Sequence, residues 1–131
     1  MATIPNGTGG YQLGDGNLSE VSLSVQATPI AKTAAAVLTA AELTNGIVTY
    51  SGAVANITLP TVALTEALVS SAKVGSSFDF SILNIGGTNT ATVVAGTGWT
   101  LVGVVTVLAL VSSSWRAVKT GDGTWSAYRL A

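Results

Sequence analysis

The chain has 131 residues, enough for one domain with a buried core. Only 8% of them are charged, against roughly 25% in an ordinary soluble domain, and the formal net charge of −1 offers no basic stripe for a phosphate backbone. Nucleic acid is therefore an unsuitable partner, and the absence of His and Cys excludes imidazole bases, thiolate nucleophiles, disulfides and the usual zinc sites. A surface so poor in charge is suited to packing against other protein, which indicates a subunit of an assembly.

Residues 1–20 are predicted to form an extended, glycine-rich N-terminal arm that only a partner orders. The arm begins without the basic and apolar regions of a secretory signal. Its acidic stretch lacks the spacing of a calcium loop and the cleft that a catalytic acid pair needs. We therefore expect a protein-docking segment made by Tyr11, Asp15, Asn17 and Glu20, in which Tyr11 anchors and the acids pair with basic groups of a partner protein or a sister protomer. The alternative is that these residues form a disordered leader with no role in docking.

Residues 21–131 are predicted to form a single β-rich domain. The stretch VSLSVQ, residues 21–26, alternates apolar and polar side chains as a half-buried strand does. Thr39 precedes Glu42 by three residues, which resembles a capping box that opens a short helical turn ended by Asn45 and Gly46. A strand over 47–50 follows, and Pro60 ends the next strand because it has no amide donor.

The stretch TVALTEALVSSAK predicts the one sizeable helix, with Val62, Leu64, Leu68 and Val69 at near-helical spacing. Alternation returns in SSFDFSILN, which predicts a strand. The apolar run Trp99–Val111 is too short to cross a bilayer as a helix, so we expect buried β structure there, with a turn near Gly103.

The last residues predict two strands, SSSWRAVK and TWSAYRL, joined by the hairpin tip TGDGT. AGTGWTLV and TGDGTWSAY look alike, and we interpret this as shared hairpin chemistry rather than a repeat. Short strands with turn signals at this spacing predict an all-β fold, an antiparallel β-sandwich or barrel with one short helix.

No enzyme is predicted, and no cofactor, metal or small-molecule substrate. The acids outside the arm have structural explanations as a helix cap, a helix face, a strand face and a hairpin tip: Glu42, Glu66, Asp79 and Asp122. The serines at 112–114 have no His or Lys base near them in the sequence. Three tryptophans are candidates for stacking against a sugar, although core or interface packing is the commoner role: Trp99, Trp115 and Trp125.

Five stretches together resemble the small head decoration, or cement, proteins of tailed bacteriophages: MATIPNGTGGYQLGDGNLSE, VLTAAELTNGIVTYSGAVANITLPT, VGSSFDFSILN, GTGWTLVG and WSAYRL. The resemblance implies an all-β, jelly-roll-like body, commonly a homotrimer, seated where capsid subunits meet, and no catalytic residues. We therefore expect a structural protein that binds the outer surface of the virion head and stabilises contacts between major capsid protein subunits, after synthesis in the host cytoplasm. No membrane partner is expected. The alternative is a phage fibre or receptor-binding module that recognises host-surface glycan.

Overall fold

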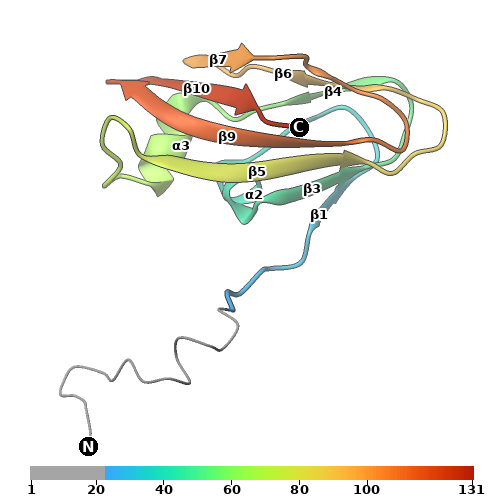
Figure 1. Ribbon diagram of the computed structural model, residues 1–131, viewed down its shortest axis with the longest axis horizontal. Helices are drawn as coiled ribbons and strands as arrows, with labels where there is room; N and C mark the ends of the chain where they lie inside the picture. The colour runs from blue at the N-terminus through green and yellow to red at the C-terminus, as the bar shows by residue number, and fades with distance from the viewer. Residues whose placement is uncertain (1–22) are drawn as a thin grey trace, which may run out of the picture.

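The computed structural model describes residues 23–131 (Figure 1). These residues form ten strands and two short helices. In chain order the elements are β1 (Ile30–Lys32), β2 (Ala36–Val37), α2 (Ala40–Asn45), β3 (Ile47–Tyr50), β4 (Ala55–Thr58), α3 (Val62–Leu68), β5 (Ser77–Asn84), β6 (Ala91–Val94), β7 (Trp99–Val102), β8 (Thr106–Val107), β9 (Ser112–Gly121) and β10 (Thr124–Arg129).

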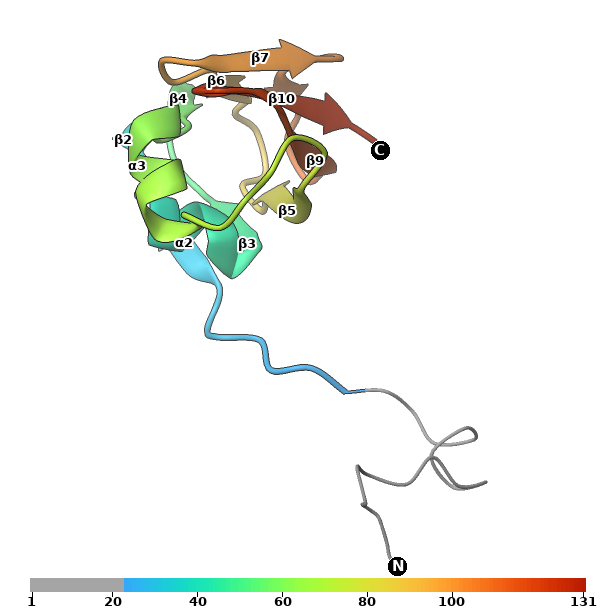
Figure 2. The ribbon, with the colours of Figure 1, turned by 90° about the vertical axis from the view of Figure 1, so that its left-hand side faces the viewer.

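The strands form two sheets, ordered β1-β3-β5-β9-β10-β7 and β2-β4-β6-β8. From β1 to β9 the chain alternates between them, with odd strands in the first sheet and even strands in the second. As far as β6, each return lays a strand parallel to the one before it in the same sheet, so this part of the chain winds like the coils of a short solenoid. Figure 2 shows both sheets and both helices arranged around one interior.

The β-rich prediction is confirmed, but the expected antiparallel pairing is wrong for most of the molecule. Five of the eight strand pairs are parallel. The antiparallel pairs are β5–β9, β9–β10 and β6–β8. Up to β6, connections through the other sheet or through a helix return the chain to the starting end of its neighbour, which makes parallel pairs. The short β9–β10 hairpin makes an antiparallel pair.

The capping box of α2 is confirmed. The Thr39 hydroxyl accepts a hydrogen bond from the Glu42 amide at 3.1 Å, and the Glu42 carboxylate accepts one from the Thr39 amide at 3.0 Å. Gly46 ends the helix in the left-handed region at φ 96°. The described residues contain two helices, because the predicted helical turn after Thr39 forms a six-residue helix in addition to the helix predicted in TVALTEALVSSAK.

The helix α3 lies where it was predicted, but its buried face is different. Val62 and Thr65 are buried, whereas Leu64 and Leu68 are exposed. Thr65 is able to lie in the core because its hydroxyl donates to the Thr61 carbonyl at 3.1 Å, which leaves no unsatisfied donor. Apolar spacing therefore identified the buried Val62 and the core-packed Val69, but it placed the exposed Leu64 and Leu68 on the buried face.

The core is held by aromatic side chains of the first sheet and aliphatic side chains of the second. Phe80 and Trp115 stack across β5 and β9, with ring planes 1° apart and centroids at 6.1 Å. Trp99 and Trp125 are register partners on the parallel strands β7 and β10, with ring centroids 5.8 Å apart. The two stretches interpreted as similar hairpins are thus neighbouring strands, and the predicted β9–β10 hairpin is confirmed.

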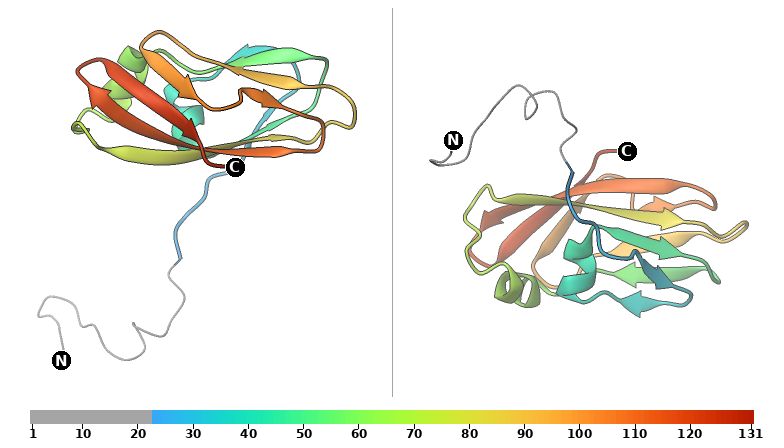
Figure 3. Two further views of the ribbon diagram at one scale, coloured as in Figure 1. Left: turned by 45° about the horizontal axis from the view of Figure 1, so that its top comes forward. Right: turned by 90° about the horizontal axis from the view of Figure 1, so that it is seen from below.

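The predicted strand over 21–26 is wrong in its described part. Residues 23–29 form no strand and are exposed, and they run away from the body ahead of β1 (Figures 1 and 3). The apolar–polar alternation fits a strand, yet a strand requires a neighbour, and none of the described strands pairs with this segment. Gln26 and Asn45 hold its end against α2, through hydrogen bonds from Gln26 to the Asn45 carbonyl at 2.8 Å and from Asn45 to the Thr28 carbonyl at 3.1 Å.

Candidate protein-docking surface

The residues predicted to form the docking segment, Tyr11, Asp15, Asn17 and Glu20, lie outside the described residues. Their role in docking stays a prediction. The docking surface considered below belongs to the folded body and was not predicted from the sequence.

Most charged side chains of the body are paired with one another. Lys32 lies 2.8 Å from Glu42 across β1 and α2, and this hydrogen bond, with help from the Thr39 amide, holds the pKa of Glu42 below its ordinary value. Arg116 donates two hydrogen bonds to Asp79, at 2.8 and 3.2 Å, and lowers the pKa of that carboxyl. These acids have the structural roles that the sequence indicated.

Glu66 joins α3 to the last two strands. Its carboxylate lies 2.9 Å from the Lys119 ammonium and accepts a hydrogen bond from the Trp125 indole at 3.0 Å. The Lys119 bond first, and then the indole, lower the pKa of Glu66. This carboxylate is therefore a packing link rather than a general acid, which would need a raised pKa.

The three tryptophans do not form a carbohydrate platform. All are buried. Each indole N–H also has a partner inside the protein: Trp99 donates to the Pro60 carbonyl, Trp115 to the Ser113 hydroxyl and Trp125 to Glu66. Their faces are therefore not available to a sugar, and the glycan-binding alternative loses the residues on which it relied.

Within residues 23–131, no group of three or more side chains of the metal-ligating types is gathered at one place. Ser113 is buried and donates to the Ile82 carbonyl at 3.0 Å, which is a structural role. In the same part of the chain, no helix has the length and apolar character needed to cross a membrane.

A groove forms where β7 and β10 separate. The two strands pair in parallel as far as Val102 and Tyr128. The chain then turns at Gly103, φ 113°, and crosses to the second sheet as β8, while the residues after β10 continue along β9 through a hydrogen bond from the Leu130 amide to the Ser114 carbonyl. A Cβ at position 103 would lie 2.9 Å from the Arg129 Cβ, so this divergence requires glycine.

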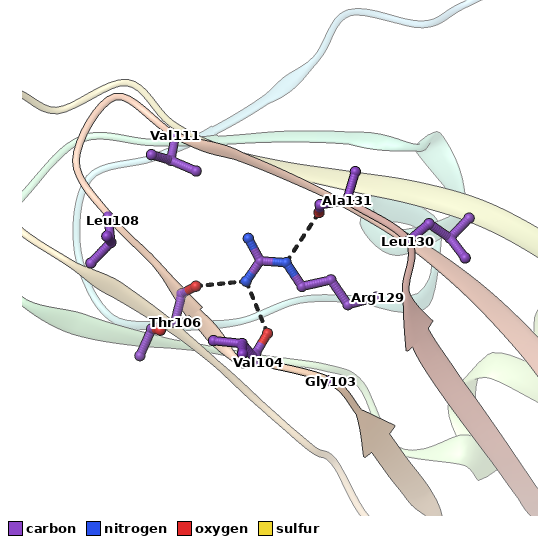
Figure 4. A pocket seen from close by; sticks show the side chains of 8 residues that line it. All are labelled: Gly103, Val104, Thr106, Leu108, Val111, Arg129, Leu130 and Ala131. Atoms are coloured by element: carbon purple, nitrogen blue, oxygen red, sulfur yellow. Dashed lines mark hydrogen bonds between the residues drawn. The ribbon is translucent and has the colours of Figure 1, made fainter.

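Arg129 bridges the two walls of the groove (Figure 4). Its Nη1 donates to the carbonyls of Val104 and Thr106 at 2.9 and 2.7 Å, and its Nε donates to the Ala131 carbonyl at 3.1 Å. Within residues 23–131, Nη2 has no hydrogen-bond partner. The guanidinium therefore fixes the groove and keeps donor capacity for an acceptor from outside.

The groove is apolar on both sides and has a volume of about 420 Å³, within the roughly 300–1,000 Å³ of typical binding pockets. Its lining residues are Gly103, Val104, Thr106, Leu108, Val111, Arg129, Leu130 and Ala131. We call this set the apolar groove. Val104, Leu108, Val111 and Leu130 are all exposed there.

A second hollow of about 240 Å³ adjoins the apolar groove and shares Val111 with it. Ile85 and Leu110 stand exposed at its edge. Leu110 is 75% exposed and has φ 61°, a left-handed conformation that costs an apolar residue roughly 1–2 kcal/mol. Its amide donates to the Gly86 carbonyl at 3.2 Å, which ties the turn before β9 to the turn after β5. The fold thus holds an apolar side chain outward at a cost in backbone strain.

The sequence did not reveal this surface. The run Trp99–Val111 was expected to be buried, and the strand, turn and strand are confirmed, but only Trp99 and Val107 of that run are buried. Leu108 and Leu110 were expected in the core and lie outside it. The two polar residues of the run, Thr100 and Thr106, are exposed, but nothing in its apolar residues distinguishes an exposed position from a core position.

Comparison with known proteins gave no match. No family model, no curated protein and no solved structure is similar to this chain.

Proposed function

We propose that this protein is a structural decoration protein of a tailed-phage head, which binds the outer surface of the shell as an oligomer and strengthens contacts between major capsid protein subunits. The observation that carries the proposal is the joined apolar surface of the groove and the adjoining hollow, on a body whose charged side chains are mostly paired internally. Exposed apolar patches of this kind mark protein contact sites.

The resemblance of the sequence supports the capsid as the partner. It implies a jelly-roll-like body, whereas the sheets here are mixed. The proposal therefore relies on the surface of the body and on the acidic arm rather than on topology. In this scheme the arm, with Tyr11, Asp15, Asn17 and Glu20, contacts the shell.

The mechanism is mechanical. A protein that binds the assembled shell better than its separated subunits stabilises the shell by mass action. When one oligomer carries several copies of the contact, the first contact raises the effective concentration of the others, and the affinity of the oligomer for the shell rises. Because apolar contacts dominate, binding is expected to change little with salt.

Co-sedimentation with expanded shells of the cognate phage that lack the protein tests the proposal. The full chain should saturate at a fixed ratio to capsid subunits, and a variant that begins at Ser19 should fold and fail to bind. The matched control is Asp122→Asn, which removes a carboxylate at the β9–β10 tip and should bind as the unchanged protein does. Absence of binding by the folded full chain would refute the proposal.

A further inference from the structure

The segment ahead of β1 carries an apolar edge that no other residue within 23–131 covers. Leu23 is 87% exposed and Val25 is 100% exposed, and Ser24 separates them. In an extended chain the two apolar side chains lie on one side, about 7 Å apart. Fully exposed apolar side chains in an alternating pattern indicate a segment that binds a partner in extended form.

The same body presents an apolar groove that no residue of the described range 23–131 fills. Val104 is 65% exposed, and Leu108 and Leu130 are also exposed on its walls. The chain thus contains both an extended apolar segment and a groove of suitable size and character.

We propose that residues 23–26 of one copy bind in the apolar groove of a second copy, with Leu23 and Val25 directed between its walls. This proposal deepens the proposed function and rests on it for its biological setting. It assigns the groove to the contact within the oligomer and leaves the adjoining hollow, with Ile85 and Leu110, to the shell.

The direction of the segment favours the groove of a second copy over the groove of its own chain. Gln26 and Asn45 fix the end of the segment against α2, and residues 23–25 run away from the body (Figures 1 and 3). A contact between two different surfaces of identical chains propagates from copy to copy and closes into a ring when its rotation permits. Such a ring is compatible with the homotrimer that the resemblance implies.

Charge also favours this partner. Residues 1–22 contain two acids, Asp15 and Glu20, and no Lys or Arg. Arg129 is the charged residue of the apolar groove, and its Nη2 is the nitrogen that has no acceptor within residues 23–131. A carboxylate of the incoming arm would accept a hydrogen bond from Nη2, and this charged hydrogen bond would fix the orientation of the apolar contact.

Thiol cross-linking tests the proposal directly, because the chain has no cysteine of its own. Two single-cysteine proteins, Leu23→Cys and Val104→Cys, are mixed without shells and treated with a short bismaleimide. The control mixture pairs Leu23→Cys with Val74→Cys, an equally exposed valine (69%) beside the far end of β9, next to Gly75, whose amide binds the Lys119 carbonyl. A dimer-sized band on a denaturing gel is expected in the first mixture and not in the control.

Light scattering gives a second readout that needs no new cysteine. Leu23→Ser with Val25→Ser should weaken self-association about tenfold or more, since two apolar side chains lose their burial. Val74→Ser should leave the mass unchanged. The expected mass of the unchanged oligomer is about 39 kDa if three chains of 13.0 kDa form the ring.

Three results would overturn the proposal: no cross-link, a cross-link only when both cysteines are placed in one chain, or a monomeric full chain at micromolar concentration. The second would assign the segment to its own groove. A monomer that still saturates shells would leave the shell-binding part of the proposed function standing, whereas an oligomer that does not bind shells would refute the proposed function alone.

Discussion

Replacing Asn84 by aspartate should destabilise the body strongly at neutral pH. Asn84 is buried at the end of β5, where its Nδ2 donates to the carbonyls of Asn89 at 2.7 Å and Val107 at 3.0 Å. Its Oδ1 accepts from the Gly86 amide at 3.1 Å. The side chain thus joins the turn after β5 to the second sheet.

Asn84→Asp keeps the shape and removes both donors. The two lost hydrogen bonds cost about 2 kcal/mol, and leaving buried carbonyls unsatisfied beside a carboxylate adds roughly 1–3 kcal/mol. The free energy of unfolding should therefore fall by about 3–5 kcal/mol at pH 7, a large part of the roughly 5–15 kcal/mol of a typical domain. Urea denaturation followed by tryptophan fluorescence should show a midpoint lower by about 1.5–3 M.

The loss should shrink in acid. Burial and the facing carbonyls raise the pKa of the introduced carboxyl above its unfolded value of about 3.9. The contribution of this carboxyl group to the free energy of unfolding is therefore fully present below about pH 3.9 and is lost as the pH rises through the pKa of the group in the folded protein. Asn56→Asp, on an exposed position of β4, is the matched control and should change little. An Asn84→Asp variant as stable as the unchanged protein at pH 7, or one whose deficit grows in acid, would refute this reasoning.

Three further outcomes are expected. Gly103→Ala should lower the midpoint of thermal unfolding and distort the apolar groove, because the new methyl would lie 2.9 Å from the Arg129 Cβ at φ 113°; unchanged melting would contradict the close approach. Thr39→Ala should cost about 0.5–2 kcal/mol in urea unfolding through loss of the N-cap, whereas Thr39→Ser should cost much less. The pKa of Glu66 is lowered in the folded protein, so its contribution to stability is present above its ordinary pKa of 4.5 and is lost as the pH falls through the folded value. Glu66→Gln should therefore flatten the acid side of a plot of unfolding free energy against pH. A plot unchanged by this variant would exclude a role for the pair with Lys119.

Local features were predictable because their partners are close in sequence. The capping box needs only Thr39 and Glu42, and the alternation of β5 is visible within eight residues. Strand direction was not predictable in the same way, because a half-buried strand alternates equally in parallel and antiparallel sheets. One weak feature of the sequence reflects the way the chain alternates between the two sheets. Leu38 and Leu59 are buried just after β2 and β4, and the threonine that caps the next helix comes one residue after Leu38 and two residues after Leu59.

The apolar groove was not predictable, since burial depends on what the rest of the chain covers. Leu108 and Leu110 belong to a run that looks like core, and only the divergence of two strands after Gly103 leaves them outside. The docking segment of the arm, in contrast, was proposed from residue types alone and has no described geometry.

The position of β9 has a consequence for the order of folding. This strand lies between β5 and β10 and joins the parallel strands β1, β3 and β5 to the rest of the first sheet. During synthesis the earlier strands emerge with the edge of β5 uncovered, and the edge stays open until the last twenty residues leave the ribosome. Closure of the sheet is therefore a late event, and chains truncated within β9 would expose a long edge ready to pair with other chains.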